Sequence, residues 1–165
     1  PGNLCEYLVE SIEKNEWRPH TWYNNVANSF GSEETMELDV QNITGEHQQL
    51  LTPFMIQAGS AYNAIYSFQC ERTLQIMNKF SSIRFNRYTP GQIMRQHHDH
   101  IHSLFDGNEK GIPVLSFILN LNDDYEGAEL FFWDDHVMFP SLFLFPHGVK
   151  EATKGKRYSA VSWAW

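Results

Sequence analysis

Basic residues, cysteines and long hydrophobic runs are all scarce in this chain. It has 12 Lys and Arg against 20 Asp and Glu, which gives a formal charge of −8. Neutralising nucleic-acid phosphates requires a basic surface, so this balance argues against a nucleic-acid-binding protein. No apolar run reaches the ~18 residues that a transmembrane helix needs, so no membrane span is predicted.

The two cysteines, Cys5 and Cys70, are far apart in the sequence. They could form a disulfide, but nothing in the sequence requires one, and we expect a reducing, cytoplasmic setting. Residues 1–6 lack the basic and apolar regions of a secretory signal, although the chain need not begin at its native start.

The N-terminal half predicts two helices. Apolar residues recur at helical spacing over roughly residues 2 to 15, with acidic residues between them, which indicates an amphipathic helix. From Gly45 onward a second apolar set predicts another helix, although Pro53 leaves its start open. Residues 41–44 and 61–68 give no clear indication. The apolar positions are Leu4, Leu8 and Ile12, then Leu50, Leu51, Phe54, Met55 and Ala58.

Short β-strands are expected from about Ser81 onward. Residues 82–88 alternate apolar and polar side chains, as a half-buried strand does, and Thr89-Pro90-Gly91 is a turn sequence. Residues 113–121 form an apolar run suited to a central strand. Further strands are predicted at 128–133, 137–145 and 157–165. Short strands after a helical start predict a mainly β fold, a sandwich or jelly roll supported by two or three helices.

Four histidines and one aspartate lie within residues 96–102. Residues i and i+2 of a strand point to the same side, so His97 and Asp99 can reach one ion while His98 faces away. The alternative interpretation is a solvated, histidine-rich loop that binds metal only adventitiously.

A third metal ligand would have to come from a separate strand. His147 follows a run of aromatics, and Arg157 comes ten positions later. Alone, His147 is typical of a surface or core histidine, and Arg157 of a solvent-facing strand arginine. Together they predict an iron site, because two imidazoles and a carboxylate on one face of iron leave positions open for co-substrate and dioxygen. A guanidinium can bind the carboxylate of an oxo-acid through two parallel hydrogen bonds.

Other polar residues near these motifs are open to two interpretations. Ser159 shares the strand face of Arg157 and can add a hydrogen bond, and Tyr88 is either an ordinary strand aromatic or part of the site. No Glu adjoins the histidines as a water-activating base, which argues against a hydrolytic zinc enzyme. Because three protein ligands suffice, four further histidines are expected in loops or at the surface. They are His20, His100, His102 and His136.

Six motifs over residues 82–165 carry a family resemblance. They are Arg87-Tyr88-x-x-Gly91, His97-x-Asp99, Tyr125-Glu126-Gly127-Ala128-Glu129-Leu130, Phe139-Pro140-Ser141, His147-x-Val149 and Gly155-x-Arg157-Tyr158-Ser159, followed by Trp163. In order and spacing they resemble the prolyl-4-hydroxylase-like branch of the 2-oxoglutarate and Fe(II)-dependent dioxygenases, particularly its small bacterial and phage members. A phage-encoded member would work in the host cytoplasm.

The resemblance implies a double-stranded β-helix whose mouth holds Fe(II). His97, Asp99 and His147 would be the iron ligands, and Arg157 would bind the distal carboxylate of 2-oxoglutarate. Dioxygen would be the second co-substrate, with ascorbate as a reductant. Further co-substrate contacts are implied for Tyr88, Ser159 and Asn120.

One domain is expected over residues 1–165, because the sequence contains no repeat, low-complexity tract or linker. Residues 1–80 would supply helical support and outer strands, and residues 81–165 the metal-binding jelly-roll core. The family implies hydroxylation of a C–H bond in a proline-containing peptide or protein, but fold does not choose the substrate. A small-molecule or free-amino-acid hydroxylase and a non-catalytic, cupin-like metal-binding module stay open, and a carboxylate-binding Arg157 argues against the last.

The sequence departs from the family pattern at two places. Gly127-Ala128 stands where the family usually has two glycines, which adds one methyl group. Only residues 134–138 link Trp133 to Phe139, where the family has a further strand and a Gly-Asp turn. Because loss of a barrel strand would expose an unpaired edge, absence of residues from this sequence is the favoured explanation.

Overall fold

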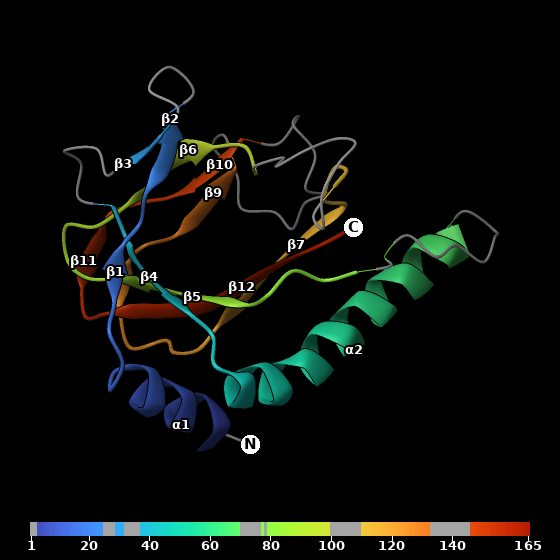
Figure 1. Cartoon of the computed structure of the whole chain (residues 1–165), viewed down its shortest axis with the longest axis horizontal. Coiled ribbons are helices and arrows are strands. Elements are labelled where there is room, and N and C mark those ends of the chain that lie inside the picture. The colour runs from blue at the N-terminus through green and yellow to red at the C-terminus, as the bar shows by residue number, and fades with distance from the viewer. Residues whose placement is uncertain are drawn as a thin grey trace.

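The computed structural model describes residues 3–24, 29–31, 37–69, 77, 79–99, 110–132 and 146–165 (Figure 1). Its two helices are α1 (Asn3–Ile12) and α2 (Gly45–Gln69). The strands of the N-terminal half are β1 (Arg18–Pro19), β2 (Trp22–Asn24), β3 (Ser29–Gly31) and β4 (Asp39–Asn42). Those that follow α2 are β5 (Arg84–Tyr88), β6 (Met94–His97), β7 (Leu115–Asn120), β8 (Glu126–Gly127), β9 (Leu130–Phe132), β10 (His147–Val149), β11 (Ala152–Lys154) and β12 (Arg157–Ala164).

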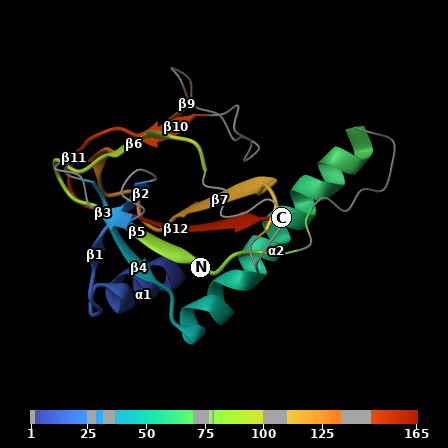
Figure 2. The same ribbon diagram turned by 45° about the horizontal axis from the view of Figure 1, so that its top comes forward.

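A five-stranded antiparallel sheet forms one wall of the fold. Its order is β1-β4-β5-β12-β7, and a three-stranded sheet of order β6-β10-β9 lies opposite. Two-stranded pairs β11-β8 and β2-β3 complete the described sheets. Figures 1 and 2 show both helices on the side of the large sheet that faces away from β6, β9 and β10. The predicted mainly β architecture with N-terminal helices is confirmed.

The main hydrophobic core lies between the large sheet and the two helices. Alternate residues of β5, β7 and β12 point toward the helices, as the two-residue period of a strand requires. The helical apolar positions predicted from the sequence meet them there, except that Phe54 and Ala58 of α2 are exposed. The buried members of this core include Leu8, Ile12, Leu51, Met55, Phe85, Leu115, Phe117, Tyr158 and Ala160.

The N-terminal half contributes strands as well as helices to this framework. β1 and β4 extend the large sheet beyond β5, with Val40 opposite both Arg18 and Asn86. The helix that begins at Gly45 continues through Pro53 and across residues 61–68, for which the sequence pattern was ambiguous. Neither helix in the described ranges carries an apolar stretch long enough for a membrane crossing.

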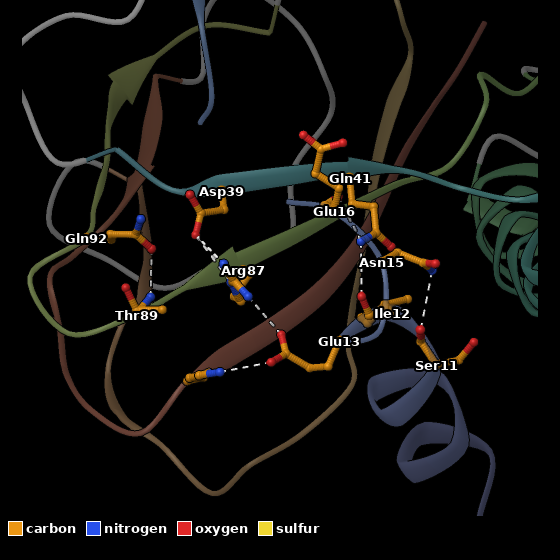
Figure 3. A network of polar contacts seen from close by, with 11 residues as sticks. Ser11, Ile12, Glu13, Asn15, Glu16, Asp39, Gln41, Arg87, Thr89 and Gln92 are labelled. Carbon is orange, nitrogen blue, oxygen red and sulfur yellow. Dashed lines mark hydrogen bonds and ion pairs between the residues drawn. The ribbon is translucent and has the colours of Figure 1, made fainter. Parts of the chain in front are cut away.

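An ion-pair network on the helix side of the large sheet fixes the end of α1 (Figure 3). Arg87 of β5 lies 2.8 Å from Asp39 Oδ2 and 3.0 Å from Glu13 Oε1, and Lys156 Nζ lies 2.9 Å from the second oxygen of Glu13. The Arg87 guanidinium also stacks 4.6 Å from the ring centre of Trp17. The network joins four segments that are distant in sequence.

Gln41 satisfies backbone groups that the end of α1 leaves open (Figure 3). Its amide Nε2 donates to the carbonyl oxygens of Ile12 at 3.1 Å and of Glu16 at 3.2 Å. The last carbonyls of a helix have no partner within the helix, so a buried amide donor replaces water at this position. Gln41 therefore links β4 to the end of α1 through hydrogen bonds.

Candidate metal centre

Three ligand-type side chains converge between β6 and β10. His97 is the last residue of β6, Asp99 lies just beyond it, and His147 begins β10 directly opposite His97. His98, between the first two, is exposed, as strand alternation predicts. One ligand atom from each of His97, Asp99 and His147 lies within 4.8 Å of the others.

The distances within this triad suit a shared metal ion. Asp99 Oδ1 lies 3.9 Å from His97 Nε2 and 3.6 Å from His147 Nε2, and the two imidazole centres are 4.4 Å apart. Neighbouring ligand atoms bound at about 2.1 Å to one octahedral ion are about 3 Å apart, so the two distances from Asp99 need to shorten by less than about 1 Å.

The protonation state of His97 also suits metal binding. Burial, followed by the charge of His147, lowers the pKa of His97 to about 4, so its imidazole is neutral at pH 7. Its Nδ1 lies 2.9 Å from the Arg95 carbonyl oxygen and must donate to it. That bond leaves the Nε2 lone pair facing Asp99 and His147, as a metal-binding histidine requires.

Ser116 orients the carboxylate of the triad. Its hydroxyl on β7 donates a short hydrogen bond to Asp99 Oδ2, which leaves Oδ1 toward the two histidines. Ser116 was not recognised in the sequence, although a polar residue inside the apolar run 113–121 was a visible signal. Two nitrogen donors and one carboxylate oxygen on one side fit Fe(II).

Arg157 lies buried at the start of β12, with 3% of its surface exposed. Its Nε and Nη2 donate to Asn120 Oδ1 at 3.2 and 2.8 Å, and Nη1 donates to the Ala128 carbonyl at 3.1 Å. A guanidinium has five N–H donors, so two have no partner among the described residues and can serve a ligand. Asn120 therefore contacts Arg157 and holds its guanidinium group in place.

Tyr88 and Ser159 lie beside Arg157 on the same face of the large sheet. Tyr88 is the cross-strand neighbour of Arg157, and its ring centre is 5.4 Å from the guanidinium carbon. Burial raises the pKa of Tyr88 to about 12, so it keeps its proton. Ser159 stands opposite Asn120 and is 1% exposed. The structure thus brings together all four residues that the sequence grouped as co-substrate contacts.

A layer behind His97 was missed in the sequence. The Trp22 ring packs edge-on against His97 at 5.2 Å and against His20 at 4.7 Å, and Arg95 stacks on it at 4.5 Å. His20 was expected in a loop or at the surface. It lies in the link between β1 and β2, but it is buried there: it is 7% exposed, and burial lowers its pKa to about 4. β2 is too short to show a period, so local pattern carries no signal for this packing.

The hairpin between β8 and β9 departs from the expected strand 128–133. Gly127 and Ala128 both have positive φ, 75° and 57°, and the strand resumes only at Leu130. A side chain at Gly127 would collide with the backbone of Glu151 and Thr153. The turn is needed because it aims the Ala128 carbonyl at Arg157.

Several predictions fall outside the described residues. These are the loop positions His100, His102 and His136, the strand 137–145, and the shortened link between Trp133 and Phe139. Cys70 also lies outside, while Cys5 is an exposed free thiol.

Comparisons with solved structures find the same fold. A viral collagen prolyl hydroxylase from Paramecium bursaria chlorella virus 1 superposes with a TM-score of 0.62 at 12% identity, covering 99% of this chain and 89% of that one. A Pseudomonas putida prolyl-4-hydroxylase gives 0.63 at 21% identity, covering 99% and 87%. An oxidoreductase of the 2OG-Fe(II) oxygenase family from Burkholderia pseudomallei gives 0.51 at 10% identity, covering 96% and 78%. The expected double-stranded β-helix is confirmed by this likeness.

Comparison with protein families carries the identification further. No curated protein sequence matches the chain significantly. Residues 83–165, which contain the triad and Arg157, match the 2OG-Fe(II) oxygenase superfamily. This family implies Fe(II) as the cofactor and 2-oxoglutarate as the co-substrate. The chain belongs to the 2OG-Fe(II) oxygenase superfamily.

Proposed function

We propose that this protein hydroxylates a C–H bond of a prolyl residue in a peptide or protein, at the expense of 2-oxoglutarate and dioxygen. His97, Asp99 and His147 are the proposed iron ligands. Two solved structures of similar fold are described as prolyl hydroxylases, which supports the choice of substrate class. We also propose that residues 1–165 act as one catalytic domain, since β1 and β4 extend the sheet that carries the site.

The observation that carries this proposal is the buried Arg157. Its guanidinium lies in the same barrel as the triad and keeps two donors free. A metal site that only stabilises the fold has no use for a carboxylate-binding group, whereas an oxo-acid co-substrate needs one. Arg157 therefore separates an oxygenase from a structural metal site.

Each residue has a distinct part in the proposed reaction. Iron with bound 2-oxoglutarate supplies the oxidising power for the hydroxylation. The imidazoles of His97 and His147 and the carboxylate of Asp99 would hold the metal, and Ser116 keeps that carboxylate turned toward the histidines. Arg157 holds the distal carboxylate of 2-oxoglutarate, which fixes the orientation of the keto acid.

The residues around Arg157 keep this binding group dry and rigid. Asn120 accepts two of its hydrogen bonds, and Tyr88 covers its side in neutral form. A guanidinium held in place loses little entropy when a carboxylate binds, and exclusion of water strengthens the pair. Tyr88 and Ser159 are proposed as additional donors to the same carboxylate.

The substrate is tested with a panel of proline-containing peptides under Fe(II), 2-oxoglutarate and ascorbate. Mass spectrometry should detect the gain of one oxygen atom together with succinate. Asp99→Ala should reduce succinate formation at least ~100-fold, because the metal loses its charged ligand. His98→Ala is the matched control, since His98 is the exposed neighbour, and it should stay active. Absence of hydroxylation across the panel with persistent succinate formation would shift the substrate to small molecules, and retained turnover in Asp99→Ala would refute the ligand assignment.

A further inference from the structure

A second arginine faces the barrel interior at the opposite end of β5 from Tyr88. Phe85 packs into the helix-side core, so the preceding Arg84 points toward the small sheet. Its Nε donates to Asn86 Oδ1 at 3.0 Å, and its guanidinium carbon lies 5.4 Å from the ring centre of Trp163. In the sheet Arg84 stands opposite Val161.

The charge of Arg84 lacks a carboxylate partner in the part of the chain that the structure describes. One of its five donors is used, by a neutral amide. Arg87, three residues along on the other face of the strand, instead contacts both Asp39 and Glu13. Burial lowers the pKa of Arg84, and the charge of Asp99 acts against that shift. A partly buried cation without a close anion is costly, which points to a ligand.

Arg84 is well separated from the place assigned to the 2-oxoglutarate carboxylate. Arg157 stands opposite Tyr88, four residues from Arg84 along β5, a backbone separation of about 13 Å. The charge of Asp99 nevertheless acts on Arg84, and that of Arg84 acts on His97. The two arginines therefore lie at opposite ends of the interior face, with the triad across from them.

Formal charges leave Arg84 unbalanced once the known components are bound. Iron(II) beside Asp99 has one net positive charge, and Arg157 adds another. The dianion of 2-oxoglutarate neutralises these two. Glu37 and Arg95 lie 3.8 Å apart and balance each other, so the positive charge of Arg84 is left over. A substrate with one negative charge would complete the balance inside the barrel, where charges are poorly screened.

His20 adds a neutral polar group to the surroundings of Arg84. Burial and then the positive charge of Arg84 lower its pKa, so it is uncharged at pH 7. Its buried Nδ1 has no hydrogen-bond partner among the described residues. A carboxylate has acceptor sites for both a guanidinium and an imidazole N–H.

We infer that Arg84 is a substrate-binding residue and that the substrate presents a carboxylate to it. This inference rests on the proposed function and specifies its substrate class. The carboxylate has two possible sources. One is the α-carboxyl group of proline, either as the free amino acid or at the C-terminus of a peptide. The other is an acidic side chain next to a prolyl residue. Both present the same group to the guanidinium, and the experiment separates them.

The test uses protein loaded with Mn(II) and 2-oxoglutarate, because Mn(II) broadens the proton NMR signals of ligands close to it. The first probes are N-acetyl-L-proline and N-acetyl-L-prolinamide, which differ only in the carboxylate. The second pair is the capped tripeptides Ala-Pro-Glu and Ala-Pro-Gln. The variants are Arg84→Gln, which keeps a hydrogen-bond donor for Asn86, Arg84→Lys, which keeps the charge, and Arg18→Gln, which removes an exposed arginine as control.

In wild type, the acid of at least one pair should bind about tenfold or more tightly than its neutral partner, as expected for a charge-assisted hydrogen bond. Arg84→Gln should abolish that preference, Arg84→Lys should keep part of it, and Arg18→Gln should leave it unchanged. The pair that shows the preference identifies the source of the carboxylate. Equal broadening by acid and amide in both pairs, or no broadening at all, would overturn the inference.

Failure of the proposed function gives a different result. Stabilisation of the Mn(II) protein by 2-oxoglutarate reports on the metal site and Arg157, and Arg84→Gln should retain it. Loss of that stabilisation in wild type would refute the oxygenase site itself. A normal 2-oxoglutarate response without acid preference would refute only the assignment of Arg84.

Discussion

The two faces of the large sheet are built from the same strands but differ in chemistry. Toward the helices, β5, β7 and β12 present an apolar core that includes Phe85, Phe117 and Ala160. Toward the small sheet, the alternate positions of the same strands carry arginine, asparagine and serine, several of them buried. Buried polar groups cost stability unless they are paired. The face toward the helices therefore stabilises the fold, whereas the face toward the small sheet carries the residues proposed for function.

The largest contrast between the two faces is expected at adjacent residues of β5. Phe85→Ala removes a fully buried ring from the helix-side core and should lower the free energy of unfolding by about 3–5 kcal/mol. Asn86→Ala, on the barrel face, removes a hydrogen bond to Arg84 and should cost only about 1 kcal/mol. Chemical denaturation of the metal-free variants measures both. Similar losses would contradict the division of roles between the faces.

The next effect concerns the pH dependence of the metal-free protein. The pKa of His20 is lowered to about 4 from the ordinary value of 6.5, so the unfolded state binds a proton first as pH falls. The free energy of unfolding should therefore decrease as the pH falls from 6.5 to about 4, and His20 should have no effect on it above pH 6.5. The full contribution is about 3 kcal/mol. Denaturation of wild type and His20→Gln across this range should give converging stabilities at low pH; parallel curves would count against the burial of His20.

The smallest effect is expected at the hairpin beside Arg157. Ala128 holds a φ of 57°, a left-handed conformation that glycine adopts without the clash of a Cβ. Ala128→Gly should therefore raise the free energy of unfolding by about 0.5–1 kcal/mol, after allowance for the greater entropy of unfolded glycine. Thermal denaturation measures the change. A destabilised variant would mean that the buried methyl group contributes more by packing than the backbone loses by strain.

The parts of the fold with a clear period were predictable from the sequence. Alternation placed Arg157 and Ser159 on one face of β12, and the His97-x-Asp99 spacing put two ligand side chains on one side. The turn at Gly91 and the helix near residues 2–15 follow from local residue chemistry in the same way.

The residues that support the site were not predictable in this way. Ser116 and Arg84 act through partners distant in sequence, which only the strand register brings near. Trp22 lies on a three-residue strand and His20 beside it, so neither shows a period. Such positions depend on tertiary packing, which overrides local pattern.

The most direct test of the account is the melting temperature of the Mn(II)-loaded protein with and without 2-oxoglutarate. A ligand that binds only the native state raises this temperature by mass action. Wild type should be stabilised by 2-oxoglutarate in the presence of Mn(II), whereas His97→Ala should lose the response to both and Arg157→Gln should respond to Mn(II) but not to 2-oxoglutarate. An unchanged melting temperature in wild type, or an equal response in Arg157→Gln, would contradict the proposed site.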